Sequence, residues 1–126
     1  MPESPDVDAV LVSRAHPLPS TIGAIRAVLL AVPDVVESVK WNSPNYALRD
    51  DFATLSMRRD AAVQVVLHTG AKPKPEHPQI VIDPLPGFAK WADRNRAVLT
   101  FTADGLSEHE LGELRRVVAA WVDQLE

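Results

Sequence analysis

One stretch, residues 40 to 46, gathers more chemically useful side chains than any other part of the chain. It holds an ammonium group (Lys40), an indole (Trp41), an amide (Asn42) and a phenol (Tyr46). Groups of this kind exchange hydrogen bonds with a small polar or anionic ligand. The stretch therefore predicts the rim of a ligand pocket. In the alternative, it is a helix-to-strand turn that Trp41 anchors to the core.

Two later residues suit the same ligand. His68 ends a strand-like run, and Arg94 carries the planar guanidinium that pairs with carboxylate or phosphate. Each also has a structural interpretation, because a backbone or hydroxyl group can satisfy His68, and Arg94 can pair with Asp83 or Asp93. The predicted ligand-binding residues are Lys40, Trp41, Asn42, Tyr46, His68 and Arg94.

Acidic residues offer candidates for a metal site, because iron and other hard ions prefer carboxylate and imidazole ligands. The candidates are Asp6 with Asp8, Asp34 with Glu37, Asp50 with Asp51, and His109 with its flanking glutamates. None has the two-histidine spacing of a strong metal motif. Each suits a helix cap or a solvated face equally well. We therefore assign no metal ligand and no certain cofactor, and we retain iron as the one cofactor to be tested.

Motifs typical of enzymes are missing from the sequence. It has no G-x-S-x-G elbow, no phosphate loop and no dinucleotide fingerprint. The lack of cysteine removes disulfides, thiolate metal sites and a cysteine nucleophile together. A hydroxyl nucleophile needs a base and an orienting acid, and nothing nominates a partner for His68. We therefore favour a non-catalytic protein that binds a small ligand or a metal, with an enzyme of unknown reaction as an alternative.

Composition narrows the class of protein. With 126 residues, 46% of them hydrophobic, the chain suits one domain with a real core. The net charge of -4 argues against a nucleic-acid binder, which usually shows a basic face. No apolar run reaches the roughly 18 to 20 residues that span a bilayer, so we expect no membrane partner. The acidic N-terminus lacks a signal pattern, and we expect a cytoplasmic location.

Apolar spacing predicts helices near both ends of the chain. Residues 5 to 14 and 22 to 32 show helical periodicity, and Ser20 or Thr21 is expected to cap the second helix. A short helix is expected over residues 34 to 39. At the C-terminus, Ser107 and Glu110 form a capping box before a long apolar stripe that ends at Leu125.

Alternating residues predict strands between these helices. They cover residues 46 to 48, 52 to 57, 62 to 68 and 96 to 102, with an edge strand at 79 to 82 and one helical turn at 88 to 93. One face of the strands is apolar, whereas the other mixes polar and apolar residues, as in a sheet covered on one side. We predict an α+β two-layer sandwich: a small, mostly antiparallel sheet with N-terminal and C-terminal helices on one face, as a single domain over residues 1–126.

The segment from Gly70 to Pro86 contains five prolines, which forbid a helix and favour an extended path. It would serve as a docking loop or a lid over the mixed face, or as a rigid crossover. An exposed mixed face would also suit a homodimer. A protein-interaction module is thus a further alternative.

The decapeptide from Glu37 to Tyr46, with its Lys-Trp-x-x-Pro-x-Tyr signature, resembles the YdhG-like family of small bacterial domains of unknown function. Similar positions in that family carry runs like Leu67–Gly70, Ile82–Pro84 and Asp93–Val98, and the resemblance covers Leu18 to Leu125. It implies a compact α+β domain of frataxin-like character. It also implies, as the alternative function, a carboxylate-based intracellular iron chaperone, although no motif for that role can be transferred to single residues.

Overall fold

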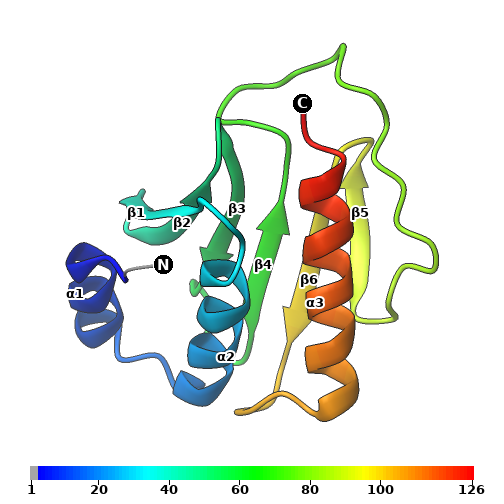
Figure 1. The fold of residues 1–126 in the computed structure, drawn as a ribbon. Helices are drawn as coiled ribbons and strands as arrows, with labels where there is room; N and C mark the ends of the chain where they lie inside the picture. Colours follow the sequence, from blue (N-terminus) through cyan, green and yellow to red (C-terminus); the bar gives the residue numbers. More distant parts are fainter. Residues whose placement is uncertain (1–2) are drawn as a thin grey trace.

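The computed structural model describes residues 3–126 and contains three helices and six strands in that range (Figure 1). In chain order they are α1 (Pro5–Arg14), α2 (Pro19–Leu30), β1 (Val36–Lys40), β2 (Ser43–Ala47), β3 (Asp51–Ser56), β4 (Val63–Leu67), β5 (Ala89–Asp93), β6 (Arg96–Phe101) and α3 (Glu108–Asp123). The element types and their order confirm the predicted α+β class.

The six strands form one sheet in the order β1-β2-β3-β4-β6-β5, and every neighbouring pair is antiparallel. The first four strands form a meander of hairpins. The proline-rich segment then carries the chain past the position of β6 to the far edge of the sheet, where β5 begins (Figure 1). Strand β6 returns between β4 and β5, so the last two strands close the sheet as a hairpin.

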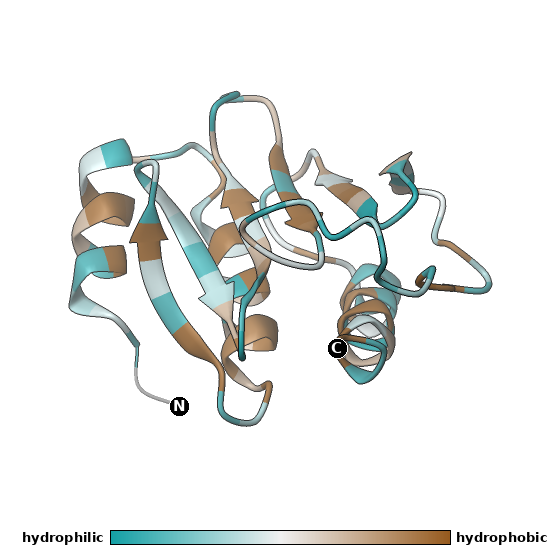
Figure 2. Cartoon of the chain, turned by 90° about the horizontal axis from the view of Figure 1, so that it is seen from above, coloured by the Kyte–Doolittle hydropathy of each residue, from teal (hydrophilic) through white to brown (hydrophobic). Residues whose placement is uncertain are grey.

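One face of the sheet, the covered face, is apolar in register. Leu55 pairs with Val65, and Val65 pairs with Leu99; these side chains are fully buried. Helices α2 and α3 lie side by side on this face (Figures 1 and 2), and their buried side chains join the same core. Trp121 of α3 is the largest fully buried residue of that core. Helix α1 instead contacts β1 and β2 at the sheet edge.

The other face is the open face, and none of the three helices in the described part of the chain covers it (Figure 2). Its residues are partly exposed and mix polar with apolar types, because they alternate with the buried residues of the covered face. On β3, β4 and β6 they are Thr54, Ser56, Gln64, Val66, Val98 and Thr100. The predicted contrast between two faces is confirmed.

Polar groups cap the N-termini of both helices on the covered face, α2 and α3. The capping box of α3 is confirmed, since Ser107 and Glu110 satisfy each other's backbone N–H groups. The predicted cap of α2 by Ser20 or Thr21 is wrong: the helix begins at Pro19, and the carboxylate of Asp104 accepts the N–H groups of Ser20 (2.7 Å) and Thr21 (3.4 Å).

None of the helices in residues 3–126 is long and apolar enough to cross a bilayer.

Two predicted helical segments are strands. Residues 36 to 40 form β1 instead of a helix over 34 to 39, because Asp34 takes a left-handed conformation (φ 65°) and the next residues pair with β2. The predicted helical turn at 88 to 93 is also wrong, since 89 to 93 form β5 beside β6. In both segments, backbone hydrogen bonding to a neighbouring strand outweighs the helical preference of the local sequence.

Residues 79 to 82 were predicted as an edge strand and are not one. Side chains, rather than a neighbouring strand, bind this backbone: Ile80 donates to Asn95 Oδ1 at 2.8 Å, and Val81 exchanges two bonds with the Gln124 side chain. Lys74 pairs with Asp50 near the start of the same proline-rich segment. These anchors favour the crossover interpretation of the segment over a lid.

Candidate functional site

Trp41 and Asn42 form the two-residue turn of the β1–β2 hairpin. Both have left-handed backbones, with φ of 54° and 59°, as a type I′ hairpin turn requires. The Trp41 side chain is 97% exposed. The stretch is therefore a strand-to-strand turn rather than a helix-to-strand turn, and the interpretation of Trp41 as an anchor to the core is wrong.

Tyr46 points away from the open face into a buried polar cluster. Its hydroxyl donates to Glu37 Oε2 at 2.7 Å, and the same carboxylate accepts two bonds from Arg26, at 2.7 and 2.9 Å. The Ser4 N–H adds a fourth bond at 2.8 Å. The Glu37 side chain is fully buried, and these four bonds occupy its carboxylate. Because the donors come from the N-terminal segment, α2 and β2, the cluster joins these elements to β1.

Charge states in this cluster follow from its bonds. Burial and the bond to Glu37 raise the pKa of Tyr46, so it stays a neutral donor. Burial alone would raise the pKa of Glu37, but the bonds from Arg26, Ser4 and Tyr46 outweigh it and hold that pKa below its ordinary value. Glu37 also raises the pKa of Arg26. Glu37 is thus a structural carboxylate whose oxygens are already occupied.

Arg94 lies in the β5–β6 turn and holds the proline-rich segment. It donates to the carbonyl oxygens of His77 at 2.9 Å and Pro75 at 3.3 Å. Within residues 3–126 it forms no ion pair with Asp83 or Asp93. Its guanidinium is thus engaged by this segment, and within residues 3–126 Arg94 shares no hydrogen bond with the other predicted ligand-binding residues.

Lys40 and His68, in contrast, belong to one polar chain that crosses β1 to β4. Lys40 pairs with Asp51, which accepts a bond from Asn45 Nδ2 at 2.9 Å. Thr54 Oγ1 continues the chain: it lies 3.4 Å from both Asn45 Oδ1 and His68 Nε2. Strand pairing places these groups together, since Asn45 is the register partner of Thr54.

The hydrogen bonds of His68 indicate which nitrogen carries its proton. Nδ1 lies 3.0 Å from the Gly70 carbonyl oxygen, which can only accept, so a neutral ring has its proton on Nδ1. Nε2 is then an acceptor, and it competes with Asn45 Oδ1 for the single Thr54 hydroxyl proton. Burial lowers the pKa of His68, and the nearby Arg96 lowers it further, although Gly70, Asp50 and Asp51 oppose these effects. The imidazole is therefore neutral at pH 7.

Arg96 is the residue that sequence reasoning missed. Leu67 pairs with Ala97, so His68 and Arg96, the next residues outward, sit beside each other on the open face. The side chain of Arg96 forms no ion pair within residues 3–126. Lys90, paired with Val98, adds a second cation to the same face. The alternation of apolar and polar residues along 96 to 101 could have placed Arg96 on the open face. Only the pairing of β4 with β6 places it beside His68.

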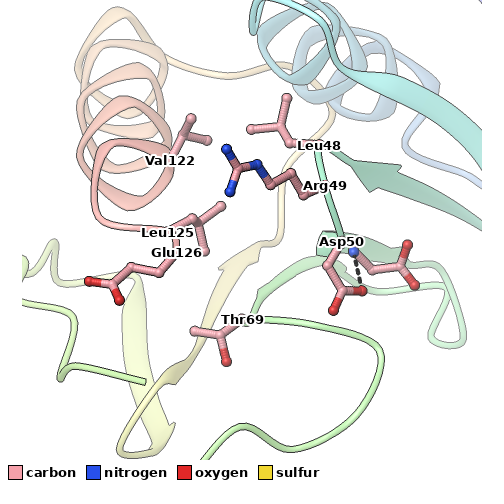
Figure 3. A pocket seen from close by; sticks show the side chains of 8 residues that line it. Leu48, Arg49, Asp50, Thr69, Val122, Leu125 and Glu126 are labelled. Carbon is pink, nitrogen blue, oxygen red and sulfur yellow. Dashed lines mark hydrogen bonds between the residues drawn. The ribbon is translucent and has the colours of Figure 1, made fainter. Parts of the chain in front are cut away.

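A small hollow of about 270 Å³ lies at the end of α3, and Figure 3 shows the Arg49 guanidinium extending into it near Val122 and Leu125. Asp50 and Glu126 contribute acidic groups to the lining, and Asp51 adds a third. The Lys74 ammonium and the N–H groups of Ala71 and Asp51 hold the pKa of Asp50 at about 2. The hollow thus combines one arginine with three acidic side chains, two of which pair with lysines.

Metal ligation receives no support from the arrangement of acidic groups. Across residues 3–126 no group of three or more His, Asp or Glu side chains is placed to hold an ion. Asp50 and Asp51 pair with Lys74 and Lys40, and Glu37 pairs with Arg26.

Comparison with protein-family models, curated proteins and solved structures finds no match for this chain. The resemblance to the YdhG-like family therefore stays a prediction.

Proposed function

We propose that this chain is a non-catalytic domain that binds a small organic or inorganic anion on the open face, in a site formed by Thr54, His68 and Arg96. The observation that carries the proposal is the position of Arg96, which forms no ion pair in residues 3–126, beside a neutral, partly buried histidine. Arginine supplies paired donors to carboxylate or phosphate. Lys40, at the far end of the same polar chain, adds positive charge, with its side chain 48% exposed.

The neutral tautomer of His68 narrows the ligand class. Nδ1–H is used by Gly70, and the single Thr54 hydroxyl proton is donated to Asn45 Oδ1, so Nε2 faces the site as an open acceptor. An anion that also carries a hydroxyl donor satisfies both Arg96 and Nε2. A hydroxy acid or hydrogen phosphate has this combination, whereas a simple dicarboxylate lacks the donor.

The test compares ligands that differ only in that hydroxyl. Isothermal titration with malate, succinate and inorganic phosphate should give binding of malate and phosphate, and weaker binding of succinate. Arg96→Gln should weaken malate binding about tenfold, because it removes a charge-assisted hydrogen bond, and His68→Asn should weaken it less, because it removes a neutral one. The matched control is Arg58→Gln, which removes an exposed arginine from the β3–β4 connection at the other end of the sheet.

Equal malate affinity in the Arg96→Gln and Arg58→Gln variants would refute the proposal. A thermal-shift series with ferrous iron, run on the same proteins, tests the iron-chaperone alternative of the YdhG-like resemblance. An iron-specific rise in melting temperature without any response to anions would favour that alternative. For the enzyme alternative, the structure offers no orienting acid, because a backbone carbonyl rather than a carboxylate holds His68 Nδ1.

A further inference from the structure

A larger, apolar groove of about 540 Å³ runs between α2 and α3. Both helices lie on the covered face of the sheet, away from the open face (Figure 1). Its α2 side is built from Ala24, Ala27, Val28, Ala31, Val32 and Pro33. Its α3 side is built from Leu111, Arg115, Val118, Ala119, Val122 and Asp123. Small-molecule sites have volumes of about 300 to 1,000 Å³ and mostly apolar walls, so this groove has the size and lining of such a site.

The groove exists because α2 turns its small residues toward α3. Three alanines cannot reach across the space that larger side chains would fill, and α2 is mostly buried on its sheet-facing side instead. The two helices also run in the same direction, since Asp104 caps α2 and Ser107 caps α3 at the same end (Figure 1). The groove begins about one turn inside both helices, at Ala24 and Leu111, and ends at their C-termini.

Charged residues give the groove a polarity. Arg115 lies one turn from Leu111, toward the N-terminal end, and Asp123 lies at the C-terminal end, about 12 Å further along α3. Both are exposed, and neither forms an ion pair within residues 3–126. The helix dipoles act at the Asp123 end only, where the C-termini disfavour an anion, and Arg115 in the middle of α3 supplies the positive charge. An occupant with one anionic end and an apolar body matches this charge distribution.

We propose that the groove binds a monomeric amphiphilic carboxylate, such as a medium-chain fatty acid, with its carboxylate at Arg115 and its chain along Val118 and Val122. This site is separate from the anion site on the open face. It uses apolar burial for affinity and one arginine for orientation. A cationic amphiphile of the same length would have to place its charge against Arg115 or reverse its orientation.

The test titrates decanoate, kept below its aggregation concentration, into the protein and follows backbone amide shifts and heat. One decanoate should bind per chain, with the largest shifts at the groove-lining residues. Arg115→Gln should weaken binding about tenfold, with Arg58→Gln as the control for loss of an exposed arginine. Ala27→Phe, which fills the groove from an exposed position of α2, should abolish binding, with Ala9→Phe on exposed α1 as its control.

Several results would overturn the inference. These are equal binding of decylammonium and decanoate, unchanged affinity in Arg115→Gln, and equal behaviour of Ala27→Phe and Ala9→Phe. A dimer in sedimentation equilibrium that Ala27→Phe dissociates would show that a second copy, not an amphiphile, fills the groove. Arg96→Gln should leave decanoate binding unchanged, so failure here is distinguishable from failure of the proposed anion site.

Discussion

Trp121 of α3 donates its indole N–H to the carbonyl oxygen of His68, at 2.9 Å. The side chain of the same histidine bonds to Gly70 on the open face. His68 is thus held from both faces of the sheet, by a core helix on one side and by the crossover segment on the other. This arrangement connects the helical layer to the candidate anion site.

Replacing Trp121 by phenylalanine tests that connection. The variant leaves the His68 carbonyl without its donor and opens space in the core, so we expect a loss of about 2 to 4 kcal/mol in the free energy of unfolding. Urea titration measures it. Trp91 stacks on Trp121 with ring centroids 5.7 Å apart but is partly exposed, and Trp91→Phe is the control. Equal losses in the two variants would contradict a special role for the bond to His68.

Glu37→Gln tests the buried polar cluster. Arg26 and Glu37 are both buried, so neutralising the carboxylate leaves a guanidinium with too little compensation. We expect a loss of about 3 to 5 kcal/mol, compared with about 1.5 to 3 kcal/mol for Tyr46→Phe, which removes a single bond. Asp60→Asn, at the exposed pair with Arg14, should cost much less than either, because solvent screens an exposed ion pair. Denaturant midpoints of the wild type and the three variants would rank these effects. A loss for Glu37→Gln as small as that for Asp60→Asn would argue against a stabilising role of the buried cluster.

The pH dependence of stability should report on His68. Burial lowers its pKa in the folded protein, so the unfolded chain takes up the proton at a higher pH. The stability associated with neutral His68 is complete above the unfolded pKa of about 6.5 and is lost as pH falls below that value, by no more than about 1.4 kcal/mol per pH unit. His68→Gln should flatten the fall in stability below pH 6.5, as measured by urea unfolding at several pH values. His109→Gln, at an exposed residue of α3, should keep the wild-type slope.

The β1–β2 turn predicts a stabilising change. Type I′ turns prefer Asn-Gly, whereas Trp41 and Asn42 both hold positive φ here. Combining Trp41→Asn with Asn42→Gly should raise the free energy of unfolding by about 1 kcal/mol. Thermal and urea unfolding can measure the gain. A loss of stability instead would mean that the indole contributes to folding despite its exposure.

Local patterns in the sequence were sufficient for much of the fold. The capping box at Ser107 and the apolar stripe behind it predict α3, because both signals lie within one helix. Alternation in β3 and β4 predicts a covered and an open face, because side chains of a strand point to opposite sides. These features depend on residues close together in the chain, and such spacing can be read directly.

Tertiary structure decided the rest. The cap of α2 comes from Asp104, more than 80 residues away, and β1 and β5 are strands because partners pair with them. For the site, the sequence by itself determined that Lys40 and His68 could do chemistry, but it did not single out Arg96. Only the sheet decided that His68 meets Thr54 and Arg96, while Tyr46 turns into the core and Arg94 holds a loop. The physical reason is that side-chain periodicity is local, whereas strand order and register depend on which distant segments bury their apolar faces together.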